Sequence, residues 1–381
     1  MKRILLLAAF VAVTVGAVIP PDPRWQEAHG DVRVLAIRAT WGPQPEDAGN
    51  LSGAAAFYDR ASFGKLRLHI DLTPWLQAFA GPVCPSGPSS RSAFGSLGES
   101  AQDAATAAGY DLTSYARIAY FLPDETCNAV GTGVGREVFL TTSGGVLDDQ
   151  VFVHELGHTF GLPHAKGSSC VRGCRIEEYG DPYSPMGGGA LDFTALEKLK
   201  LGWISSVQRV DRSRTYTVAD IDVPVSSPQA LVVPTTAGEY WIEHRSTEPR
   251  RLYIRVVRPD NAAHPQYLFS IFLDHAQDRY IARGVFSLTS GFRFAWLDRK
   301  RPTRPRVRAL DHAYLAWSRS LDAGSGLAAY RVTVDGKLLA TTTLTGAALP
   351  LLPHGRHRVS VVAVDRAGNR SRPGTVSLAV S

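Results

Sequence analysis

The first half of the chain alternates between two hydrophobic patterns. Runs of apolar or alternating residues typical of strands are separated by segments typical of helices. We expect strands over 32–40, 65–72, 117–122 and 137–142, and helices over 54–63, 100–108 and from about 148 onward. Asp148 or Asp149 would cap the last helix. Strands interleaved with helices predict an α/β sheet with helices packed on it.

The second half of the chain changes to short strand patterns separated by turn residues. One group predicts an all-β module, with strands over 215–219, 230–234, 240–244, 252–257 and 267–273. A later group predicts a small β-sandwich, with strands over 314–317, 329–334, 337–343, 358–365 and 375–380 and a hairpin turn at Asp335-Gly336. The domains that we expect are therefore an α/β one over 25–205, an all-β accessory one over 206–300, and a β-sandwich with a basic linker over 301–381.

The N-terminus reads as a signal peptide. Lys2 and Arg3 precede an apolar run over 4–15, and the small residues of 15–17 offer a cleavage site. The alternative is an uncleaved N-terminal anchor. No later run reaches the roughly 18 continuous apolar residues that a transmembrane helix needs. We therefore expect a signal peptide over about 1–17, a secreted, extracellular protein and no transmembrane segment.

The four cysteines of the chain suit two disulfides formed outside the cytosol. Four cysteines allow three connectivities. We favour Cys84–Cys127 and Cys170–Cys174, because each pair lies within its own stretch of chain. For the second pair we expect a disulfide that closes a loop rather than a second metal site.

The chain carries a formal net charge of +6, which raises the question of a nucleic-acid or membrane partner. The charge is unevenly distributed, because 301–381 holds 12 basic and 4 acidic side chains, whereas 18–300 has a net charge of −4. The excess is concentrated where Arg301, Arg304, Arg306 and Arg308 lie close together. This segment is either a solvated linker or a docking site for an anionic cell-surface polymer, and no nucleic-acid partner is needed.

The chemistry lies in residues 154–164, which read HELGHTFGLPH. His154 and His158 are four residues apart, so on a helix they share one face and suit a single Zn²⁺. Glu155 is placed to take a proton from zinc-bound water as the general base. Gly161 lets the chain leave the helix through a positive φ, which would return His164 as a third ligand. Three protein ligands leave one position open for water, as a catalytic zinc site requires.

A second motif follows at 179–189, YGDPYSPMGGG, where a tight turn would place Met186 beneath the metal ligands. Together the two motifs resemble the metzincin zinc peptidases, and within them the gametolysin family. The stretches that carry this resemblance are 154–165, 178–181, 184–187 and 201–203. The resemblance implies a mixed twisted sheet with helices, zinc ligands at His154, His158 and His164, and a general base at Glu155. It also gives Met186 the role of the Met-turn methionine.

Several details of the site stay open at this stage. Some metzincins carry a zinc-approaching tyrosine two residues after the methionine, where this chain has Gly188. Tyr179 or Tyr183 would then steady the oxyanion. The strand expected over 137–142 is either a sheet edge, with which an extended substrate would pair, or an ordinary internal strand. The acidic residues at 177, 178 and 181 either hold Ca²⁺ or lie in a solvated loop.

The C-terminal segment resembles a fibronectin type III domain, on residues 315–317, 322–330, 334–336 and 361–371. Such modules usually bind or space rather than catalyse. The function that we expect is a secreted, zinc-dependent endopeptidase that hydrolyses peptide bonds of extracellular proteins. A non-catalytic adhesion or carbohydrate-binding protein on a peptidase fold is the alternative, against which the intact Glu155 argues. A cell-wall peptide amidase, which would use the same zinc chemistry, also stays open.

Overall fold

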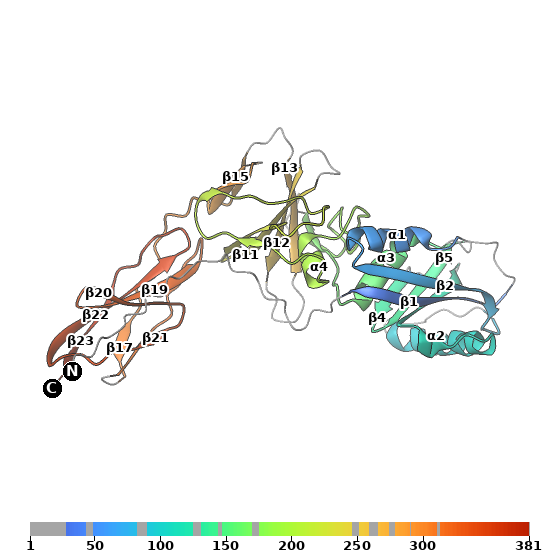
Figure 1. Ribbon diagram of the computed structural model, residues 1–381, viewed down its shortest axis with the longest axis horizontal. Helices are drawn as coiled ribbons and strands as arrows, with labels where there is room; N and C mark the ends of the chain where they lie inside the picture. Colours follow the sequence, from blue (N-terminus) through green and yellow to red (C-terminus); the bar gives the residue numbers. More distant parts are fainter. Residues whose placement is uncertain are drawn as a thin grey trace, which may run out of the picture.

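The computed structural model describes residues 28–42, 49–81, 90–124, 131–143, 147–169, 175–245, 251–258, 266–273, 279–289, 291–310 and 313–380. These residues form several β-sheets and few helices, which follow one another in sequence order along an elongated molecule (Figure 1). None of the described helices is long and apolar enough to cross a membrane. The segment expected to be a signal peptide and all four cysteines lie outside the described residues, so the two disulfides stay predictions.

The N-terminal part is a five-stranded sheet with the strand order β2-β1-β3-β5-β4. Strands β1, β2, β3 and β5 run parallel, and β4 is antiparallel to β5, so the sheet is mixed, as expected. Its elements are β1 (Gly30–Thr40), α1 (Ser52–Ala61), β2 (Leu66–Gln77), α2 (Ser90–Ala107), the 3₁₀ turn η1 (Leu112–Ser114), β3 (Arg117–Asp124), β4 (Gly131–Val134), β5 (Glu137–Ser143) and α3 (Asp149–Thr159).

Helices cover both faces of this sheet (Figure 1). Val34 and Ala36 of β1 pack in the core that contains α1 and α3, whereas Leu35 and Ile37 pack in the core that contains α2. All four side chains are fully buried. A strand covered on both faces is apolar at consecutive positions, which explains why 32–40 reads as a continuous apolar run.

The edge of the sheet next to α3 is β4, and β5 lies inside the sheet between β3 and β4. Of the two alternatives for 137–142, the sheet edge is therefore wrong and the internal strand is confirmed. The sequence pattern missed β4 because two of its four residues, Gly131 and Gly133, are glycines, which strands disfavour.

The middle part begins after a short hairpin and a helix and contains two sheets around one core. Their strand orders are β13-β12-β11-β10-β8 and β14-β15-β16-β9. Of the stretch expected over 215–219 only Thr215 lies in a strand, and β14 to β16 were not anticipated. The elements are β6 (Gly167–Ser169), β7 (Arg175–Glu177), α4 (Ala195–Lys200), β8 (Gln208–Arg209), β9 (Arg214–Thr215), β10 (Leu231–Thr235), β11 (Gly238–Arg245), β12 (Arg251–Arg258), β13 (Gln266–Leu273), β14 (Arg279–Ala282), β15 (Phe286–Thr289) and β16 (Arg293–Trp296).

Helix α4 joins the N-terminal and middle parts. Leu196 and Leu199 of α4 share one buried cluster with Val232 of β10 and Trp241 of β11. A capping box at Thr194 fixes the start of the helix, because its hydroxyl accepts from the Glu197 amide while the Glu197 carboxylate accepts from the Thr194 amide. The middle sheet therefore packs directly on the segment that follows the second motif.

The C-terminal part is a sandwich of two sheets, β17-β18-β21 and β20-β19-β22-β23, around a single core. Asp335 and Gly336 both adopt positive φ, 51° and 81°, between β19 and β20, which confirms the hairpin turn. The basic segment runs without regular structure into β17. The strands are β17 (Val307–Ala309), β18 (Tyr314–Trp317), β19 (Leu327–Val334), β20 (Lys337–Thr342), β21 (Gly346–Ala348), β22 (Gly355–Asp365) and β23 (Gly374–Val380).

Candidate metal centre

Helix α3 places the first two histidines. Asp148 caps its N-terminus, because Oδ1 accepts the backbone amides of Gln150 at 2.8 Å and Val151 at 3.1 Å. On the helix, His154 and His158 lie one turn apart on one face, and their Nε2 atoms are 3.1 Å apart. The spacing of the motif therefore brings the two rings together, as predicted.

The third histidine arrives through the turn that ends α3. Gly161 has a φ of 83°, its amide donates to the His158 carbonyl, and the Leu162 amide donates to the Gly157 carbonyl. This pair of bonds is a Schellman motif, in which a glycine at positive φ reverses the chain. His164 consequently lies with its ring centre 4.7 Å from that of His158 and 5.2 Å from that of His154.

Each imidazole is held by an oxygen acceptor at its Nδ1 atom. His154 Nδ1 lies 2.6 Å from the Pro185 carbonyl and His158 Nδ1 lies 2.7 Å from the Leu162 carbonyl. His164 Nδ1 lies 2.7 Å from Oε1 of Glu178. Because these oxygens accept hydrogen bonds, Nδ1 carries the proton and Nε2 keeps its lone pair, the arrangement found in metal-ligating histidines.

The donor set fits a metal ion. His154, His158 and His164 each offer one ligand atom within 4.8 Å of the others. Two Nε2 lone pairs at 3.1 Å cannot hydrogen-bond to each other, and a shared cation satisfies both. Burial lowers the pKa of His154 and brings that of His158 to about 4, so these two rings stay neutral and free to bind metal at neutral pH.

Glu155 lies on α3 beside these ligands, against strand β4. Its side chain is buried, and a Cβ added to Gly131 would lie 2.9 Å from its Oε1. Burial raises the pKa of the Glu155 carboxyl to about 7, while a hydrogen bond from the Gly133 backbone opposes this shift. A carboxyl that titrates near neutrality suits a group that takes up and releases a proton.

Met186 lies beneath the helix that carries the ligands. It is fully buried, and a Cβ added to Gly157 would lie 2.5 Å from its Sδ. The Met186 carbonyl also accepts the Ala165 amide at 2.7 Å, which ties the turn to the chain just after His164. The structure thus places Met186 under the centre, where the sequence motif predicts it.

The two candidate tyrosines lie in different places. The ring of Tyr179 is 4.5 Å from that of His164 and 5.6 Å from that of His154, and the side chain is half exposed. Tyr183 packs instead on Tyr253 of β12, with ring centres 5.0 Å apart. Tyr179 is therefore the tyrosine beside the centre.

Sequence reasoning missed the partners of the acidic loop. Glu178 contacts both His164 Nδ1 and Lys166 Nζ, the latter at 2.8 Å. Asp181 is fully buried in an ion pair with Arg255. It is therefore neither a residue of a solvated loop nor a carboxylate free to bind Ca²⁺. Metal-bound histidines usually donate their second N–H to a carboxylate or a carbonyl oxygen. This general preference is the only basis on which a residue such as Glu178 could have been expected.

A helix presents two histidines, a turn returns a third, and a buried glutamate lies beside them, so the donor set fits a metal ion next to a carboxyl that can move a proton. The model of the gametolysin peptidase M11 family matches residues 36–245, and the chain belongs to this family. Its members are expected to use a metal cofactor, typically zinc, and the donor set described above is compatible with it. The chain thus combines a peptidase domain with β modules.

Comparison with solved structures gives only distant likenesses. The spore cortex lytic enzyme SleM of Clostridium perfringens is 16% identical over 22% of this chain and 29% of its own, with a TM-score of 0.19. OgpA of Akkermansia muciniphila is 12% identical over 96% and 98%, with a TM-score of 0.28. Archaemetzincin of Methanopyrus kandleri is 18% identical over 46% and 94%, with a TM-score of 0.24. No curated protein matches the chain.

Proposed function

We propose that the protein is a secreted, zinc-dependent endopeptidase that hydrolyses peptide bonds of extracellular proteins, with Glu155 as the general base. The observation that carries this proposal is the triad of imidazoles, each oriented through Nδ1, next to a buried carboxyl. Membership of a metallopeptidase family supports the reaction class. The four cysteines and the apolar N-terminus support secretion.

In this proposal His154, His158 and His164 hold the zinc ion through Nε2. Bound zinc supplies Lewis acidity, which lowers the pKa of water toward neutrality and polarises a peptide carbonyl. Glu155 takes the proton of the attacking water at its carboxylate and then delivers it to the leaving amine. The Tyr179 hydroxyl is the candidate donor to the oxyanion, since its ring lies beside two of the ligands.

The substrate, in this proposal, lies extended along strand β4. Within the residues that the structure covers, β4 pairs only with β5, so its other edge is open to a further strand. Gly131 and Gly133 bring this strand against Glu155, because a Cβ on Gly133 would lie 2.0 Å from the Glu155 carbonyl oxygen. A peptide added to that edge would run past the general base.

For the C-terminal sandwich we propose a binding or spacing role of the fibronectin type III kind. The four clustered arginines, Arg301, Arg304, Arg306 and Arg308, are all exposed, which supports contact with an anionic cell-surface polymer. A solvated linker remains the alternative outcome of the test described in the Discussion.

The proposal is tested by incubating the purified protein with unfolded protein substrates, with and without a chelator, and identifying the products by mass spectrometry. Internal cleavage that the chelator abolishes and that added Zn²⁺ restores is the expected result. No cleavage by the zinc-loaded protein, or cleavage that the chelator leaves unchanged, would overturn the proposal. Release of terminal residues alone would leave a peptidase and remove the endopeptidase assignment.

A further inference from the structure

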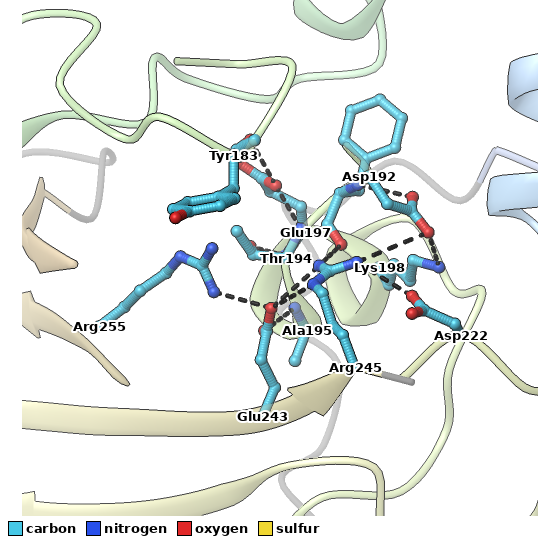
Figure 2. A network of polar contacts seen from close by, with 12 residues as sticks. Tyr183, Asp192, Thr194, Ala195, Glu197, Lys198, Asp222, Glu243, Arg245 and Arg255 are labelled. Carbon is cyan, nitrogen blue, oxygen red and sulfur yellow. Dashed lines mark hydrogen bonds and ion pairs between the residues drawn. The ribbon is translucent and has the colours of Figure 1, made fainter. Parts of the chain in front are cut away.

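A network of buried charges lies where the second motif, helix α4 and strands β11 and β12 meet (Figure 2). Arg255 of β12 is at its centre and is almost completely buried. Its Nη1 lies 2.7 Å from Oε1 of Glu243, and that same oxygen lies 2.9 Å from Nη2 of Arg245. Its Nε lies 2.6 Å from Oδ2 of Asp181, a residue of the loop that leads to Met186.

Asp181 uses its second oxygen to shape that loop. Oδ1 accepts the backbone amides of Tyr183 at 3.0 Å and Ser184 at 3.2 Å. The Ser184 hydroxyl in turn accepts the Met186 amide at 3.1 Å, and it donates to the buried carboxylate of Glu197. The backbone carbonyl of Asp181 also accepts the Gly188 amide at 2.8 Å. The tight turn over 184–187, called the Met-turn from here on, is therefore built around this one aspartate.

The Met-turn is in direct contact with the metal ligands. The Pro185 carbonyl holds His154 Nδ1 at 2.6 Å, and Met186 packs beneath Gly157 between the two helical histidines. The path from the middle sheet to a metal ligand thus has few steps. Arg255 pairs with Asp181, and Asp181 accepts the Ser184 amide. The carbonyl of the following residue, Pro185, lies against His154 Nδ1.

Arg255 also lies outside the stretch that the peptidase family model matches, which ends at residue 245. A buried carboxylate needs a partner, and Arg255 lowers the pKa of Asp181 against the effect of burial. We propose that Arg255 is a positioning residue of the metal centre, which fixes the Met-turn through Asp181 and thereby orients His154. The middle β-sheet is then part of the catalytic unit rather than an accessory, an inference that rests on the proposed metal-dependent function.

Arg245 provides a matched control, because it belongs to the same network without contacting Asp181. It is fully buried on β11 and pairs with Glu243, with Asp222 at 3.0 Å and with Asp192 at 3.8 Å. Figure 2 shows its guanidinium directed toward Asp192 and Asp222, which lie outside α4. Removing either arginine should lower the thermal stability, but only the loss of Arg255 releases the Met-turn.

The test compares Arg255→Met, Asp181→Asn and Arg245→Met in the full-length protein, with Co²⁺ as a spectroscopic probe of the metal centre. We expect Arg255→Met and Asp181→Asn to weaken Co²⁺ binding by about 10–100-fold, to change its visible absorption spectrum and to lower kcat more than they raise KM. Arg245→Met should keep the Co²⁺ affinity and spectrum of the wild type despite a lower Tm. Asp181→Asn keeps one oxygen for the turn amides but replaces the oxygen that pairs with Arg255 by an NH₂ group, so it breaks the same link where Arg255→Met fails to fold.

Unchanged Co²⁺ affinity and spectrum in a folded Arg255→Met or Asp181→Asn variant would overturn the positioning role. An equal loss in Arg245→Met would do the same, because it would trace the effect to general destabilisation. Neither result affects the proposed function. A wild-type protein that binds no Co²⁺ and cleaves no peptide would instead overturn the proposed function, and the positioning role with it.

Discussion

Met186 lies so close beneath Gly157 that a β-carbon on the glycine would stand 2.5 Å from the methionine sulfur. Gly157 occupies the position just before His158, so the absence of its side chain lets the sulfur approach the helix between the two ligands. Alanine is otherwise favoured over glycine in a helix by about 1 kcal/mol. Because of the contact with Met186, we expect glycine to be preferred over alanine at this helical position.

Gly157→Ala is predicted to destabilise the protein by up to about 2 kcal/mol, since overpacking costs about 1–3 kcal/mol and the helical gain offsets about 1 kcal/mol of it. In a Met186→Ala background the sulfur is absent, so the added methyl group meets no clash with it. The same change should then stabilise the protein by up to about 1 kcal/mol. Urea denaturation of the four proteins in this cycle measures both effects. The same sign in both backgrounds would show that the sulfur does not limit this position.

Glu178→Ala is predicted to weaken zinc binding by about 10–100-fold, because it removes the acceptor that orients His164. Its neighbour Glu177 is also exposed and acidic and provides the matched control. Competition with a chromophoric chelator measures both affinities. Equal effects of Glu177→Ala and Glu178→Ala would mean that loop charge, rather than the hydrogen bond, acts on the metal.

Glu197 is predicted to make stability fall as the pH rises from about 4.5 to about 7. Burial raises its folded pKa to about 7 from a usual value of 4.5, so in this window the folded state binds more protons than the unfolded state. Its contribution is fully present below pH 4.5 and is lost by about pH 7. Glu197→Gln cannot titrate at this position. Between pH 4.5 and pH 7 the free energy of unfolding of the variant, relative to that of the wild type, should therefore rise by up to about 3 kcal/mol. A difference between the two proteins that does not change with pH would contradict the prediction.

Replacing Arg301, Arg304, Arg306 and Arg308 by glutamine is predicted to lower the salt concentration at which the protein elutes from a sulfated polysaccharide matrix. These side chains are exposed, and screening by salt weakens such contacts. Peptidase activity on a soluble substrate serves as the control and should not change. Elution at the wild-type salt concentration would favour the solvated linker.

The three histidines could be predicted from sequence because local rules place them. Helical spacing brings His154 beside His158, and a glycine at positive φ returns the chain to His164 within six residues. The same holds for the Asp335-Gly336 turn. In both cases the geometry depends on a few consecutive residues, and the chain elsewhere has little influence on it.

The contacts that surround the site could not be read in this way. Arg255 meets Asp181 across 74 residues, and nothing in either local pattern indicates the partner. The edge strand β4 was hidden because its glycines serve a close approach to α3 and lack the side chains that mark a strand. Strand β5 reads equally well as an edge or as an internal strand, since its position depends on where β4 pairs.

The most direct test of the account compares Glu155→Gln with the wild type. Both proteins should bind one equivalent of Zn²⁺ with similar affinity, because the three imidazoles and their acceptors remain. The variant should lose at least about 10²-fold in kcat on a peptide substrate with little change in KM, since the group that moves the proton is gone. Wild-type kcat in a Glu155→Gln protein that holds its zinc would contradict the role of Glu155 as general base.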